Sequence, residues 1–163
     1  MPINDDIKFY LTGGVGNSDP DLSLGNARST TEIITSTNAN LFANVTSGEA
    51  SGGSTKYRCI SLRNEGVVSY DLGVFLATVT ESQSTKFYLA NGSSGLNGTE
   101  PVISDEDTEP PDLIYKHPSA EYDPLVMLTL APNDFANLWL KRVISSGAGG
   151  SLKDYIRLTP VET

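Results

Sequence analysis

Histidine and cysteine, the side chains that most often carry catalysis near neutral pH, occur once each in this chain of 163 residues. His117 precedes Pro118 in a proline-rich stretch, and nothing near it resembles the other members of a catalytic triad. Cys59 lies in an apolar run, where a thiol is expected to be buried and unreactive. Because a closed zinc shell needs four such ligands, the counts also disfavour zinc. We therefore expect a protein that is not an enzyme and that holds no cofactor.

Carboxylates are the remaining candidates for chemistry, since two acidic runs could offer oxygen ligands to calcium. The runs contain Asp19 and Asp21, and Asp105, Glu106, Asp107 and Glu109. Neither has the glycine and glutamate spacing of a helix–loop–helix calcium site, so solvated loops are the simpler interpretation and calcium is an alternative. Paired carboxylates also hydrolyse glycosides, but such sites usually have aromatic sugar platforms and this chain has one tryptophan. A hydrolase that uses Asp105 or Asp107 is therefore a weaker alternative.

The charge balance limits the classes of partner. Twenty acidic and eleven basic side chains give a formal net charge of −9, and the basic residues are scattered. Binding to nucleic acid depends on clustered Lys and Arg, so we expect no nucleic-acid partner. The first six residues lack the basic and apolar segments of a secretion signal, and no apolar run reaches the length of a membrane span. We therefore expect synthesis in a host cytoplasm and no membrane contact.

Short apolar or alternating runs separated by glycine-rich turns predict an all-β fold. Residues 56–80 give the clearest strand–turn–strand signal, and residues 72–80 are apolar on both faces, as expected inside a sandwich or against a neighbouring subunit. The other predicted strands are residues 7–12, 85–90, 125–130, 135–144 and 154–159. The pattern is that of a β-sandwich of immunoglobulin-like or jelly-roll type. Its predicted core consists of Ile60, Leu62, Val74, Leu76, Leu128, Leu130, Leu138, Leu140, Ile156 and Leu158.

The chain divides by composition into two parts. Residues 1–55 are rich in Gly, Ser, Thr and Asn, with few apolar residues, and predict an extended N-terminal arm with a helical turn near residues 38–44. Residues 56–163 form the predicted sandwich domain. Trp139, followed by Lys141 and Arg142, is either an interface anchor or a core tryptophan with its arginine at the rim. The interface candidates are Phe9, Tyr10, Leu11, Leu41, Phe42, Trp139 and Arg142.

Several segments, in the same order along the chain, resemble a family of small structural proteins of tailed-phage and prophage virions. The similar segments are residues 7–14, 18–25, 40–42, 47–50, 57–60 and 138–142. The loop of residues 91–122 departs from that family.

The resemblance implies a capsid decoration, or cement, protein on the virion surface. Its partners would then be the major capsid protein and neighbouring copies of itself, with the arm threading onto a neighbour to reinforce the shell. Because similar sandwiches also occur in tails and baseplates, a tail or baseplate component is the alternative, with glycan contact through residues 91–124.

Overall fold

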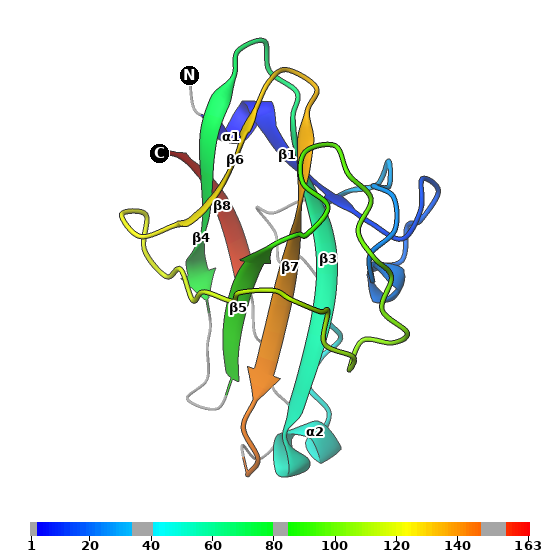
Figure 1. The fold of residues 1–163 in the computed structure, drawn as a ribbon. Coiled ribbons are helices and arrows are strands. Elements are labelled where there is room, and N and C mark those ends of the chain that lie inside the picture. The colour runs from blue at the N-terminus through cyan, green and yellow to red at the C-terminus, as the bar shows by residue number, and fades with distance from the viewer. Residues whose placement is uncertain (1–2, 34–40, 80–84, 148–155) are drawn as a thin grey trace.

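Two antiparallel β-sheets face each other in the computed structural model, which describes residues 3–33, 41–79, 85–147 and 156–163 (Figure 1). The larger sheet has the strand order β2 (Glu32–Ile33), β1 (Ile7–Leu11), β3 (Ser54–Asn64), β7 (Phe135–Ile144) and β5 (Thr85–Asn91). The smaller sheet has the order β6 (Leu125–Leu130), β4 (Tyr70–Val79) and β8 (Ile156–Glu162). The prediction of an all-β sandwich is confirmed.

The predicted strands agree closely with the observed ones, and β6 and β7 have the predicted bounds. The strand–turn–strand unit of residues 56–80 does not form one pair, because β3 belongs to the larger sheet and β4 to the smaller. The segment between these strands therefore carries the chain from one sheet to the other. β4 is the central strand of its sheet, and its Leu72, Val74 and Leu76 are buried between the sheets.

The core contains eight of the ten predicted residues: Ile60, Leu62, Val74, Leu76, Leu130, Leu138, Leu140 and Leu158. Leu128 was predicted wrongly, since 47% of its surface is exposed. The register between β4 and β6 shifts between Asp71 and Gly73, and such a bulge interrupts the alternation that would have turned Leu128 inward. The side chain of Ile156 lies outside the described residues.

Much of the predicted N-terminal arm is built into the sandwich. β1 lies between β2 and β3 in the larger sheet, and Leu41 and Val45 are buried. The helical turn expected near residues 38–44 falls partly outside the described residues, and residues 41–44 are not helical. The helices are α1 (Ile3–Asp6), α2 (Ser47–Gly52) and the 3-10 turn η1 (Pro20–Leu22). No helix in the described ranges is long and apolar enough to span a membrane.

Candidate docking groove

The predicted interface residues lie almost entirely inside the protein. Trp139 is 1% exposed, and Phe9, Tyr10, Leu11, Leu41 and Arg142 are also buried. Phe42 is half-buried and lies against Phe87 and the guanidinium groups of Arg58 and Arg142. These seven residues hold the N-terminal segment and β7 in the core. Trp139 is a core residue, as one alternative predicted, but Arg142 is buried and donates to the Ala43 carbonyl instead of lying at the rim.

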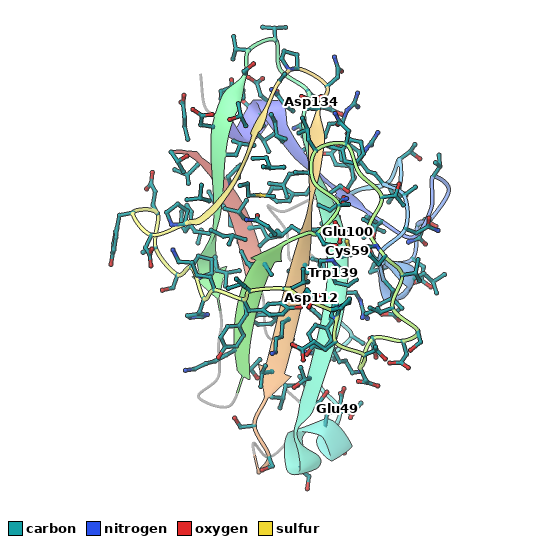
Figure 2. The ribbon with its side chains drawn as sticks, viewed as in Figure 1. Glu49, Cys59, Glu100, Asp112, Asp134 and Trp139 are labelled. Carbon is teal, nitrogen blue, oxygen red and sulfur yellow. The ribbon has the colours of Figure 1, made fainter. Side chains whose placement is uncertain are left out.

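Trp139 also anchors a loop through a buried carboxylate. Glu100 is 2% exposed, and its carboxylate accepts hydrogen bonds from the Trp139 indole N–H at 3.0 Å and from the Ser93 and Ser94 backbone amides. Burial opposes ionisation of Glu100, but the hydrogen bonds from Ser94 and Trp139 outweigh it and lower the pKa. Figure 2 shows Glu100 and Trp139 near Cys59, which pairs with Trp139 across β3 and β7. The segment from Ser93 to Glu100 is thereby fixed against the larger sheet.

The two acidic runs that could have offered calcium ligands both reach the same arginine. Arg58 is fully buried on β3, and its guanidinium binds Asp21 at 2.7 Å and Glu106 at 2.5 Å. Lys56 joins Glu106 to Glu49, with its ammonium 2.5 Å from the first carboxylate and 2.9 Å from the second. We call these five residues the Arg58 cluster. It fixes two loops to the sheet, and no group of three or more metal-binding side chains occurs among the described residues.

The remaining candidates for chemistry have structural contacts. Cys59 is fully buried, as predicted, and burial raises the pKa of its thiol, which makes the reactive thiolate harder to form. The His117 Nδ1 atom lies 2.6 Å from the Phe87 carbonyl oxygen, and its ring lies against Tyr88. Asp105 accepts hydrogen bonds from the Ser104 and Thr108 hydroxyl groups.

A groove of about 300 Å³ opens at the seam between the two sheets. It lies where β5 ends at Asn91 while β7 continues alongside, so that β6 and the start of β7 face each other across the opening (Figure 1). The Asn91 side-chain amide donates a hydrogen bond to the Val126 carbonyl at 2.8 Å and joins the two sheets there. The lining residues are Asn91, Gly92, Ser93, Gly95, Val126, Met127, Leu128, Ala136 and Asn137.

The groove has an apolar wall and polar uncharged surroundings. Val126 and Leu128 on β6 are 60% and 47% exposed, and Asn91, Ser93 and Asn137 contribute amide and hydroxyl groups. None of the described lining residues is ionisable or aromatic. The groove therefore suits the side chains of a protein segment better than acid–base chemistry or the stacking of a sugar ring.

The groove was missed because Leu128 was assigned to the core. A usable signal was present in β6, where four successive apolar residues begin at Leu125. Because a strand alternates its faces, two of the four must point away from the core. Comparisons of the chain with protein-family models, curated proteins and solved structures found no match. A functional proposal therefore depends on the groove and on the sequence resemblance.

Proposed function

We propose that this chain is a structural protein of a tailed-phage virion, a capsid decoration or cement protein that binds the outer surface of the shell formed by the major capsid protein and stabilises it. It would be made in the host cytoplasm and would reside on the capsid surface. The observation that carries the proposal is the apolar groove beside Val126 and Leu128, an exposed surface of the kind that binds other proteins. The order of the virion-like segments along the chain supports the same class.

The groove is suited to an extended segment of the capsid protein. β6 is the edge strand of its sheet, and the Val126 carbonyl points away from β4, towards Asn91. The Asn91 amide already binds this carbonyl, but in an antiparallel strand the N–H of the same residue points the same way, so this edge directs the Val126 N–H towards an added strand. Main-chain hydrogen bonds would supply part of the affinity, and the apolar wall would select the side chains.

Hydrogen bonds within the chain hold the walls of the groove in place. Gly92 donates its N–H to the Asn137 carbonyl at 2.9 Å, and Asn97 donates its N–H to the Phe135 carbonyl at 2.8 Å. Asn137 in turn donates to the Gly98 carbonyl at 2.9 Å. A site that is already ordered loses less conformational entropy on binding, which favours affinity for the shell.

The alternative is a tail or baseplate component that contacts a glycan. One observation favours it: Asn91, Gly92, Ser93 and Gly95 line the groove from the beginning of the loop expected to carry such contact. Their amide and hydroxyl groups match sugar hydroxyls. The described lining residues nevertheless lack an aromatic ring, so we place the capsid first.

Co-sedimentation tests the proposal. The purified protein is incubated with undecorated capsids or with tails, and each mixture is pelleted over a range of protein concentrations. We expect saturable binding to capsids and, for Leu128→Lys, at least a tenfold loss of affinity. Leu22→Lys is the matched control, because Leu22 is 60% exposed and does not line the groove.

The other outcomes separate the alternatives. Binding of the unchanged protein to tails alone would move it to the baseplate class, and a glycan array would then identify the sugar. Binding to neither particle would overturn the proposal. Equal binding of Leu128→Lys and Leu22→Lys to capsids would keep the function and reject the groove as the docking site.

A further inference from the structure

The outer face of the smaller sheet is a second surface with unusual composition. Its residues alternate with the buried ones on β4 and β8, so they point away from the core. They are Asp71, Gly73, Phe75 and Ala77 on β4, Arg157, Thr159 and Val161 on β8, and Val126 and Thr129 on β6. Residues 72–77 therefore have one face in the core and the other on the outside, although the sequence there is apolar on both faces.

The outer face is partly accessible at Phe75, whereas Pro124 and the Thr163 methyl group cover it at Gly73 and form its surface there. Phe75 pairs with Thr159 and is half-buried, and Ala77 is exposed. Exposing an aromatic ring to water on the outer face of a sheet is unfavourable. The same ring buries a large apolar area when a second surface covers it. The composition therefore favours a contact with another folded surface.

Opposite charges lie at the two ends of the same face. Asp71 stands near the start of β4, and Arg157 pairs with Thr78 near its end. Seven residues of strand correspond to about 23 Å at ~3.3 Å per residue, so the two charges cannot pair within one copy. In the described part of the chain neither forms an ion pair, although the Asp71 carboxylate accepts a hydrogen bond from the Thr129 hydroxyl at 2.5 Å.

We propose that this face binds the same face of a second copy of the chain, about a two-fold axis that lies in the contact plane and runs across the strands. That axis exchanges the two ends of the face, so Asp71 of each copy comes beside Arg157 of the other. Phe75, close to the midpoint between residues 71 and 78, meets its own equivalent. A partner with a single sign of charge would match only one end, whereas a second copy matches both.

This contact goes beyond docking on the shell and has a test of its own, although Val126 of the groove wall pairs with Gly73 and therefore shares the outer face of the smaller sheet. The groove lies at the seam beside β7, whereas the charged pair lies on β4 and β8. Self-association can be measured with the protein alone, in the absence of capsids. Failure of one proposal therefore leaves the other open.

Substitutions that reverse the charge at either end of the face test the inference. Dimerisation of each variant is measured by sedimentation equilibrium at low ionic strength. We expect the unchanged chain to dimerise, and Asp71→Arg and Arg157→Asp each to weaken dimerisation at least tenfold, because each places two like-charge pairs in the contact. An equimolar mixture of the two variants should form a heterodimer, since both ion pairs are then restored. The double variant should also dimerise.

Asp107→Arg changes the net charge as Asp71→Arg does, at an exposed acid that lies off this face, and should leave the dimer unchanged. Circular dichroism would verify that each variant is folded. An unchanged chain that stays monomeric at about 100 μM, a concentration that would populate a dimer with a Kd of that order, would overturn the inference. So would single variants that dimerise like the parent, or a mixture that stays monomeric.

Discussion

Arg58 illustrates how a single buried charge can organise segments that are distant in sequence. Its guanidinium binds carboxylates from residues 21 and 106, and its Nε donates to the Leu41 carbonyl at 2.8 Å. A buried cation costs free energy unless it is fully paired, so the two loops and the segment near Leu41 must be in place together. The Arg58 cluster is therefore complete only when all three segments have their native conformations.

Glu106→Gln should lower the free energy of unfolding by about 2 kcal/mol, because it leaves Arg58 buried with only one carboxylate partner. Asp107→Asn is the matched control: Asp107 is exposed in the same loop, and its change should cost less than about 0.5 kcal/mol. Urea titrations followed by tryptophan fluorescence would measure both. Equal effects of the two substitutions would show that the ion pairs contribute little.

The carboxylates of the Arg58 cluster should make the stability of the fold depend on pH. Burial raises the pKa of Glu49, but hydrogen bonds from Lys56 and Thr46 outweigh this and lower it from 4.5 to about 2, and Lys56 and Arg58 likewise lower the pKa of Glu106. A pKa depressed in the folded state means that the unfolded chain binds more protons in this range, so stability falls as the pH falls. The contribution is complete above about pH 5 and is lost towards pH 2.

We therefore expect the urea midpoint to drop between pH 6 and pH 3. The drop should be smaller in Glu49→Gln, which has already lost one of the titrating groups. A midpoint that stays constant over this range would contradict the assignment.

At the scale of elements, β4 makes a close contact that only glycine permits. A Cβ atom added at Gly73 would lie 2.8 Å from the Cβ and Cγ atoms of Pro124 and 2.9 Å from the Thr163 methyl group. Gly73→Ala should therefore destabilise the protein by about 1–3 kcal/mol through overpacking. Gly16→Ala is the control, since a Cβ there would meet no atom within 4 Å. Thermal melting of both variants measures the difference, and equal melting temperatures would show that Pro124 and Thr163 move aside freely.

The sequence predicted the strands well because their signal is local. Strand-forming composition and the turn residues on either side indicated the bounds of β6 and β7, and burial of Cys59 followed from its apolar neighbours. The sequence analysis missed α2. Thr46 and Glu49 form a capping box, and a Thr followed three residues later by a Glu is a known sequence signal for the start of a helix. The bulge that exposes Leu128 depends on pairing with β4, and the contacts of Arg58 depend on loops far away in sequence. Such features follow from tertiary structure, so a local pattern could not show them.

At the scale of the whole molecule, the larger sheet interleaves segments from the beginning, middle and end of the chain. Its order places β1 beside β3, and β3 beside β7. The predicted boundary at residue 56 therefore cuts between neighbouring strands and separates Arg58 from Asp21. The N-terminal segment is an integral part of the core, and the groove and the outer face of the smaller sheet are two surfaces through which the folded chain could meet a partner.

A fragment of residues 56–163 should consequently fail to fold. It would lack eight buried hydrophobic residues of the described part of residues 1–55. Burial of five of them, Ile7, Phe9, Leu11, Leu41 and Val45, contributes roughly 10 kcal/mol at ~2 kcal/mol each. That loss is comparable with the whole stability of a typical domain, about 5–15 kcal/mol. Circular dichroism and urea titration of the fragment should show no cooperative transition, whereas the full chain with the same purification tag should unfold in one. If the fragment unfolded cooperatively at the midpoint of the full chain, residues 1–55 would be a dispensable arm, and the apolar contacts of β1 would contribute far less than their burial implies.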